Sequence, residues 1–353
     1  MNGNRVADSV IDMEIQRAER WGRRKFVMGL TALAGSAALF GYDTKPAKAE
    51  PPPETTKIRL IHAPAICLSP MYLAEDLLHM EGFSDVEYVQ LETGTGPPLI
   101  ASGLADISMW DVPATILTMD AGKPLVMLAG IHAGCYELFG KVGIGSIRDL
   151  KGRTIAIQAF GGGDHVLISS MLAYVGMDPQ KDVQWIAGPS MRDGMQLFVE
   201  GKADAFMGFA PQPQELRARK IGRVLVDTAQ DRPWSQYFCC AVWANKEFVA
   251  KYPVATKRAL RAFLKAADIC ANEPERAARY LEAKGYEPRY EVGLEVLKSL
   301  PYARWRQSNP EDTLRFHALR LYEVGMIKSS PQKIIAQGTD WRFLNELKKE
   351  LKA

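Results

Sequence analysis

The chain has 353 residues, of which 44 are basic, 41 are acidic and 47% are hydrophobic. Residues 1–49 hold eight of the basic and five of the acidic residues, so the remainder carries 36 of each and no net charge. This balance gives no support for a nucleic-acid or membrane-surface partner, since both attract basic proteins. The roughly 300 remaining residues suit two lobes of ordinary domain size.

Residues 1–49 are predicted to be an export signal. Arg23 and Arg24 precede an apolar run of small residues at 29–40, and residues 47–49 (AKA) form an A-x-A cleavage pattern. This order is typical of a secretory signal, and the paired arginines resemble a twin-arginine signal. A membrane anchor is the alternative, but the run is shorter than the ~20 residues that a span needs. We expect cleavage after Ala49, release into a bacterial periplasm, and a proline-rich tether at residues 50–56.

From residue 57, short apolar runs alternate with helical patterns, which is typical of parallel βαβ units. Strands are predicted at 58–62, 86–91, 107–110 and 124–131. Ser69 and Asp111 are predicted N-caps, and Pro70 suits the first position of its helix. After residue 131 no helix follows, and an extended segment continues to residue 141. We assign residues 57–141 to the first part of lobe one.

A second series of elements begins at residue 154. Strands are predicted at 154–158, 183–187, 205–209, 223–226 and 237–243, with helices after the glycine run at 161–163 and after the capping-box pattern at 190–193. The rest of the chain is helical in pattern, including 256–270 and 339–351. We predict lobe two at 142–242 and the second part of lobe one at 243–353, where the C-terminal helices pack back on lobe one. The crossings near 134–136 and 240–242 would form a hinge.

The two series share a short repeat. Residues 99–109 (LIASGLADISM) align without a gap to residues 197–207 (LFVEGKADAFM), and Pro113 and Pro211 keep the same offset of 98 residues. In each copy an apolar helix end meets a glycine, the usual residue just after a helix, and a buried strand follows. The repeat predicts two related α/β lobes with a ligand cleft at their strand ends. The alternative is that unrelated α/β units use the same common pattern.

Several motifs resemble those of periplasmic substrate-binding proteins of ABC importers, in the nitrate/sulfonate/taurine and thiamin-pyrimidine (NMT1-like) branch. They are residues 70–75 (PMYLAE), 99–106 and, most specifically, 149–156 (DLKGRTIA), with the glycine run 161–165 (GGGDH) at the place of the branch's ligand-facing turn. The resemblance covers nearly all of the chain after residue 49. It implies an α/β, two-lobe periplasmic-binding-protein fold (type II), with a mainly parallel sheet and flanking helices in each lobe.

The candidate substrate-binding residues are those expected at strand ends, helix starts and the first crossing. They are Ser69, Met71, Thr93, Thr95, Trp110, Asp111, His132, Cys135, Gly161, Gly162, Gly163, Asp164, Ser190, Phe209 and Gln212. Helix N-termini suit an anionic group, and glycine lets backbone approach a ligand closely. For Asp164, capping of its helix and contact with an amine on the ligand both remain open.

The five cysteines are Cys67, Cys135, Cys239, Cys240 and Cys270. Their odd number excludes complete pairing, and neither a C-x-x-C motif nor a histidine cluster at zinc-ligand spacing is present. We expect mostly buried cysteines, whose pairing stays open, and no metal site or cofactor. No nucleophile–base pair for catalysis can be argued either.

These features predict a non-enzymatic, monomeric solute receptor that delivers a small organic molecule to a permease and its ATPase. A sulfonate-like or carboxylate-like ligand is favoured by the helix N-termini, and a thiamin-pyrimidine-type ligand is the alternative if Asp164 contacts it. Two other functions stay open. One is an iron-dependent, pyrimidine-forming enzyme of the same superfamily, although only Cys239-Cys240 stands where such enzymes have a longer cysteine run. The other is a sensor input domain.

Overall fold

The computed structural model describes residues 50–91, 96–188 and 193–353. Residues 52–353 form one compact unit, and it is described here by itself. The predicted export signal and the candidate residues Thr93, Thr95 and Ser190 lie outside the described residues. Within the described ranges, no helix combines the length and the apolar character needed to cross a membrane.

The first lobe is built on two small sheets. Strands β1 (Lys57–His62) and β2 (Asp85–Gln90) pair in parallel, and β10 (Phe238–Asn245) lies between β3 (Ile107–Asp111) and β4 (Leu125–Ala133). Every residue of β3, β4 and β10 is buried, as their unbroken apolar sequences predict. The connecting helices are η1 (Ile66–Leu68), α2 (Ser69–Met80), α3 (Pro97–Ala101) and α4 (Val112–Asp120).

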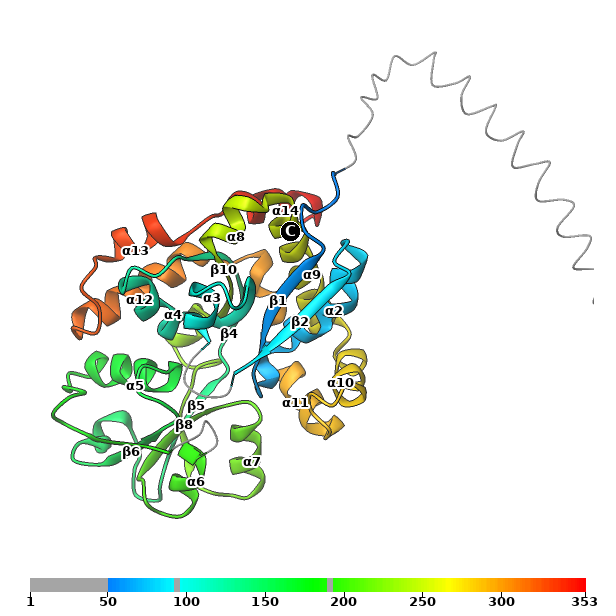
Figure 1. Cartoon of the computed structure of the whole chain (residues 1–353). Helices are drawn as coiled ribbons and strands as arrows, with labels where there is room; N and C mark the ends of the chain where they lie inside the picture. The colour runs from blue at the N-terminus through cyan, green and yellow to red at the C-terminus, as the bar shows by residue number, and fades with distance from the viewer. Residues whose placement is uncertain (1–49, 92–95, 189–192) are drawn as a thin grey trace, which may run out of the picture. The chain divides into compact units, whose positions relative to one another are not determined.

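The second lobe is built on one sheet with strand order β7-β6-β8-β5-β9. Its strands are β5 (Tyr136–Gly140), β6 (Thr154–Ile157), β7 (Gln184–Ala187), β8 (Ala205–Phe209) and β9 (Arg223–Asp227). Its helices are η2 (Ile147–Leu150), α5 (Gly163–Tyr174), α6 (Asp193–Val199), α7 (Gln212–Ala218) and η3 (Trp234–Gln236). In Figure 1 this lobe is the green lower part of the folded unit.

The strands that enter a sheet from the opposite lobe run antiparallel to their neighbours. Strand β5 pairs antiparallel with β8 and β9, and β10 pairs antiparallel with β3 and β4. Parallel pairing joins β1 to β2 and β6 to β7 and β8. The expected parallel βαβ arrangement therefore applies to strands linked through a helix, because only such a crossover returns the chain in the same direction.

The crossings lie earlier than the predicted lobe boundaries at residues 141 and 242. Strand β5 already belongs to the sheet of lobe two, and β10 from residue 238 on belongs to lobe one. The first crossing is thus at Gly134-Cys135, within the predicted hinge, and the second precedes residue 238. Both crossing strands are almost wholly buried and apolar, so their sequence pattern does not tell which sheet they join.

The repeated unit is confirmed as a helix, a glycine and a strand in each lobe. Helices α3 and α6 end before Gly103 and Gly201, whose φ angles are +75° and +81°, and strands β3 and β8 follow. In both copies the aspartate before the strand makes a backbone hydrogen bond to another strand of its own lobe, β1 in lobe one and β6 in lobe two. The backbone N of Asp106 donates to the Arg59 carbonyl at 2.9 Å, and that of Asp204 donates to the Thr154 carbonyl at 2.7 Å.

The C-terminal part of the described chain is helical. It contains α8 (Lys246–Lys251), α9 (Pro253–Asn272), α10 (Pro274–Ala283), α11 (Tyr290–Ser299), η4 (Tyr302–Arg306), α12 (Pro310–Glu323), α13 (Pro331–Gly338) and α14 (Arg342–Glu350). Helix α9 packs on α2 and β4, α14 packs on α9, and α13 packs on α4 and β4. These three helices thus pack on elements of lobe one and on one another (Figure 1).

Candidate functional site

The candidate site is a pocket between the two lobes. It encloses about 590 Å³ free of protein atoms, part of it open to solvent. Its lining residues are Ala63, Ala65, Cys67, Leu68, Trp110, Asp111, Cys135, Tyr136, Gln158, Ala159, Gly162, Gly163, Asp164, Phe209 and Cys240. The lobes also touch beside it, because the backbone N of Ile66 donates to the Ala210 carbonyl at 3.2 Å.

Lobe one contributes a carboxyl group at the end of β3. Asp111 is the N-cap of α4, where its Oδ1 accepts a hydrogen bond from the backbone N of Ala114 at 2.8 Å. The preceding residue, Trp110, also lines the pocket, and its carbonyl accepts from Nε1 of Trp243 at 3.1 Å. The predicted N-cap is confirmed, and the same side chain faces the pocket.

Lobe two contributes the turn between β6 and α5. Gly162 is the N-cap of α5, and Asp164 in its first turn accepts a hydrogen bond from the backbone N of Gln158 at 2.6 Å. A Cβ atom added to Gly163 would lie 2.3 Å from Oη of Tyr136 and 2.8 Å from Cγ of Asp111. Only glycine therefore lets the start of α5 approach lobe one this closely.

Gln158 has an unpaired amide at this turn. Its side chain is buried, yet neither Oε1 nor Nε2 has a hydrogen-bond partner among the described residues. A buried polar group without a partner costs about 1–3 kcal/mol, so its retention calls for an explanation. Because Gln158 lines the pocket, a bound molecule could take both hydrogen bonds.

The pocket is acidic and aromatic. Burial raises the pKa of Asp111 to about 8 and that of Asp164 to about 7. Tyr136 and Phe209 meet edge to face, with ring centroids 5.8 Å apart. Among the described residues that line the pocket, none has a basic side chain.

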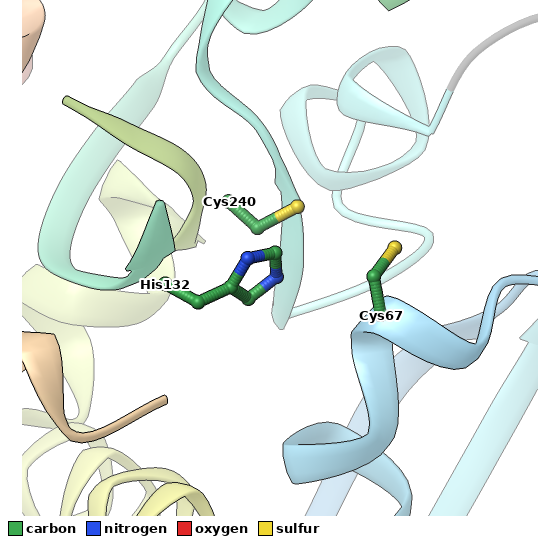
Figure 2. Close-up of side chains that lie close together, drawn as sticks. All are labelled: Cys67, His132 and Cys240. Atoms are coloured by element: carbon green, nitrogen blue, oxygen red, sulfur yellow. The ribbon is translucent and has the colours of Figure 1, made fainter. Parts of the chain in front are cut away.

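Cysteines gather beside Asp111, and Cys240 is its direct partner in the pairing of β10 with β3. Cys67 comes from η1, Cys135 from the first crossing, and Cys239 and Cys240 from β10. The Sγ atoms of Cys135 and Cys239 lie 2.7 Å apart. His132, from β4, lies with Cys67 and Cys240 in one group of potential metal ligands (Figure 2). All five cysteines are buried, as predicted, and all five are free.

The pocket brings together about half of the candidate binding residues. Trp110, Asp111, Cys135, Gly162, Gly163, Asp164 and Phe209 line it. Gly161 and Gln212 instead make local bonds, from the Gly161 backbone N to Nδ1 of His165 and from the Phe209 backbone N to Oε1 of Gln212. His132 is fully buried and is not among the lining residues.

Ser69 and Met71 are core residues rather than pocket residues. Both are fully buried, Ser69 donates to the Ile66 carbonyl, and Met71 accepts from Oγ of Ser108. The helix start that carries Ser69 does lie near the cleft, but the residues that reach the pocket are those just before it, Cys67 and Leu68. Sequence reasoning missed eight of the lining residues, which are Ala63, Ala65, Cys67, Leu68, Tyr136, Gln158, Ala159 and Cys240. A signal for Gln158 was its position at the end of a predicted strand.

Comparison with solved structures shows the fold. The chain is similar to the periplasmic nitrate-binding protein NrtA from Synechocystis PCC 6803, with a TM-score of 0.73 and 18% identity, covering 85% of this chain and 90% of that one. It is also similar to the alkanesulfonate-binding protein SsuA from Xanthomonas axonopodis pv. citri bound to MOPS, with a TM-score of 0.66 and 17% identity, covering 78% and 96%. The desulfurization enzyme DszB is a further similar structure, with a TM-score of 0.57 and 16% identity, covering 84% and 99%.

The fold is thus the two-lobe periplasmic-binding-protein fold, as the sequence resemblance predicts. A sequence comparison with curated proteins finds no significant match. The family described as NMT1/THI5 like matches over residues 71–277, more than half of the chain, from the helix after β1 to the helix that follows α9. The chain therefore belongs to the NMT1/THI5-like family.

Proposed function

We propose that the protein is a periplasmic receptor of an ABC importer, which captures a small organic molecule between its lobes. The similar nitrate-binding and alkanesulfonate-binding proteins and the predicted export signal support this role. The receptor would be exported by the twin-arginine route, act as a monomer, and deliver its ligand to a permease served by an ATPase.

The observation that carries the proposal is the unpaired amide of Gln158 at a pocket built from both lobes. A ligand that bonds Gln158 and Asp164 of lobe two, and Asp111 of lobe one, is held by both lobes at once. Such a ligand binds the closed arrangement more tightly than an open one and shifts the population toward it.

The described walls favour the amine-bearing, pyrimidine-like ligand over the sulfonate or carboxylate that the helix N-termini first suggested. An amide offers one donor and one acceptor side, which matches a ring nitrogen next to an amino group. Two carboxyl groups in the described lining can hydrogen-bond an amine, and the lining supplies no basic side chain that would hold an anion. Trp110, Tyr136 and Phe209 supply apolar faces for a flat ring.

The test is a thermal-unfolding screen with two matched panels, aminopyrimidines and alkanesulfonates, followed by titration calorimetry and solution scattering. We expect an aminopyrimidine to raise the unfolding temperature and to reduce the radius of gyration. Replacing Gln158 with Ala should weaken binding by about tenfold, because two neutral hydrogen bonds contribute about 0.5–1.5 kcal/mol each.

Gln180 offers a matched control, since it is an exposed glutamine of the same lobe. Gln180→Ala should bind as the unchanged protein does. A sulfonate that binds tightly, and equally well without the Gln158 amide, would contradict the proposed ligand class. Failure of every small molecule to bind, together with an unchanged radius of gyration, would contradict the receptor role itself.

The iron-dependent enzyme is kept as a second function to test, because thiols and His132 cluster beside the pocket and because the fold also occurs in the enzyme DszB. Iron retained through purification, with turnover of an added substrate, would favour it. We expect neither, and iron content and product formation are the measurements that decide.

A further inference from the structure

Three potential metal ligands converge from parts of the chain far apart in sequence. Cys67 lies in η1, His132 in β4 and Cys240 in β10, and their ligand atoms all lie within 4.8 Å of one another. All three side chains are buried, with exposed fractions of 3%, 0% and 3%. Figure 2 shows them grouped together, each on a different segment of the ribbon.

His132 is held in the form that a metal ligand needs. Its Nδ1 lies 3.1 Å from the Gly134 carbonyl, an acceptor, so Nδ1 carries the proton and donates. The other ring nitrogen, Nε2, is buried without a hydrogen-bond partner among the described residues, and it becomes available to a metal ion when it carries no proton. Metal-binding histidines are usually fixed in this way, with the second ring N–H bonded to a carbonyl or carboxylate.

A second group, Cys135, Cys239 and Cys240, shares Cys240 with the first. Two of its members already contact each other, since the Sγ atoms of Cys135 and Cys239 are 2.7 Å apart. It holds no unpaired nitrogen. The group that contains His132 is therefore the one with an unmet bonding requirement, which a role in packing alone leaves unexplained.

We propose that Cys67, His132 and Cys240 bind one thiophilic metal ion with a filled d shell, Zn²⁺ or Cu⁺. Thiolate and imidazole ligands together favour these ions over hard cations such as Mg²⁺ or Ca²⁺. The inference goes beyond the proposed receptor function and does not depend on it. Each thiol releases its proton to solvent when the ion binds, so binding acidifies an unbuffered solution.

The site is of the open kind. Zn–S bonds are about 2.3 Å and Zn–N bonds about 2.0–2.1 Å, so atoms around one ion lie about 3.3–3.8 Å apart. Side-chain rotations can close the present spacing of up to 4.8 Å to this value. Three protein ligands leave a fourth position on Zn²⁺, and Cys67 and Cys240 both line the pocket. With Zn²⁺, this fourth position faces the space where a solute would bind. With Cu⁺, the three protein ligands complete the coordination and leave no such position.

The test adds Zn²⁺ and Cu⁺ separately to the metal-free, reduced protein without oxygen, each against a chromophoric chelator for that ion. We expect at least one of the two titrations to show one bound ion per chain. The ion that the protein holds with the higher affinity is the proposed metal. X-ray absorption of that complex should show two sulfur ligands and one nitrogen ligand. Three sulfur ligands without nitrogen would place the ion at Cys135, Cys239 and Cys240 and overturn the assignment.

Substitutions test the same assignment. Cys67→Ala should weaken binding by at least about 100-fold, more than the ~10–100-fold expected when only a supporting partner of a ligand is lost. Cys270→Ala is the matched control, because Cys270 is equally buried and belongs to neither group of potential ligands. Equal affinity in the two variants, or no ion held against either chelator, would overturn the proposal. The absorption result on the unchanged protein decides if Cys67→Ala does not fold.

Discussion

The two copies of the repeated unit end in side chains of different polarity, an acidic one in lobe one and an apolar one in lobe two. At the offset of 98 residues, Asp111 at the end of β3 corresponds to Phe209 at the end of β8, and both line the pocket. Five residues earlier, the copies agree. Asp106 and Asp204 each accept a hydrogen bond from the backbone N of a strand of their own lobe, at 2.8 Å from Arg59 in β1 and 3.0 Å from Thr154 in β6.

The difference separates residues that build a lobe from residues that serve the pocket. Gly103 and Gly201 both need a positive φ, and both aspartates satisfy a strand backbone, so these positions have the same physical task in each lobe. Positions 111 and 209 have no shared task beyond facing the cleft. One therefore carries a buried carboxyl and the other a partly buried ring.

The largest effect on stability should come from a change of pH, because the pocket wall contains buried carboxyl groups. In the repeat, only the first copy has one, at Asp111. Burial raises the pKa of Asp111 to about 8 and of Asp164 to about 7, so the folded protein keeps protons that the unfolded chain has released. The free energy of unfolding should fall as the pH rises from about 5 to about 8, by up to about 1.4 kcal/mol per pH unit for each carboxyl. Denaturant titrations of the ligand-free protein at several pH values measure this slope.

The double substitution Asp111→Asn with Asp164→Asn should flatten this dependence, since amides do not titrate. A slope that is the same in the unchanged protein and in the double variant would show that other groups control the acid response.

The two equivalent aspartates, Asp106 and Asp204, should contribute differently to the free energy of unfolding. Asp106 is nearly buried and forms a two-pronged ion pair with Arg59, at 3.0 and 2.6 Å, whereas the side chain of Asp204 is 28% exposed. Because the Arg59 side chain is 32% exposed, Asp106→Ala should cost about 2–3 kcal/mol of unfolding free energy, less than the loss of a fully buried pair, and Asp204→Ala only about 1–2 kcal/mol. Equal losses in urea denaturation would mean that the two lobes depend equally on this contact.

Replacing the carboxyl group at position 111 should affect binding more than folding. Asparagine can still cap α4, so Asp111→Asn should leave the unfolding temperature unchanged or higher. Affinity for an amine-bearing ligand should fall by about 10–100-fold, because a hydrogen bond to a charged group contributes about 1.5–3 kcal/mol. Asp312→Asn, at an exposed position of α12, is the control in calorimetry. Tighter binding by Asp111→Asn would indicate an anionic ligand.

The contact between the lobes can be broken at Gly163. An added Cβ would overlap Tyr136 and Asp111, and such overpacking costs about 1–3 kcal/mol. Gly163→Ala should therefore weaken binding by about tenfold or more and enlarge the radius of gyration of the bound form. Gly293→Ala is the matched control, because a Cβ there meets no atom closer than 3.8 Å. Unchanged scattering from Gly163→Ala would show that the lobes do not close through this contact.

The smallest effect is expected at Phe209, the counterpart of Asp111. Phe209→Leu keeps an apolar surface but removes the edge-to-face contact with Tyr136, which is worth about 0.5–1.5 kcal/mol. We expect a loss of affinity of about threefold to tenfold by calorimetry, with little change in unfolding temperature. A loss larger than that of Asp111→Asn would reverse the assigned roles of the two positions.

Local pattern was enough to predict most of the elements and part of the pocket. Strand β8 (Ala205–Phe209) has its predicted bounds, and Asp111 caps α4 as expected, because apolar runs and caps act over a few neighbouring residues. The same logic predicted Trp110, Gly162, Gly163 and Asp164 at the cleft, since each lies at or just after the end of a predicted strand. The boundaries of the lobes were less accurate, because β5 and β10 are buried on both faces and carry no periodicity.

The sequence by itself determined the repeated framework, the helix starts and the carboxyl wall of the pocket. Only the tertiary structure decided that Ser69 and Met71 belong to the core, and that Cys67, His132 and Cys240 meet. Those three residues are separated by 65 and 108 positions, and no short spacing such as C-x-x-C links them. Contacts between elements so far apart depend on how the strands cross between lobes, which no local pattern of side chains encodes.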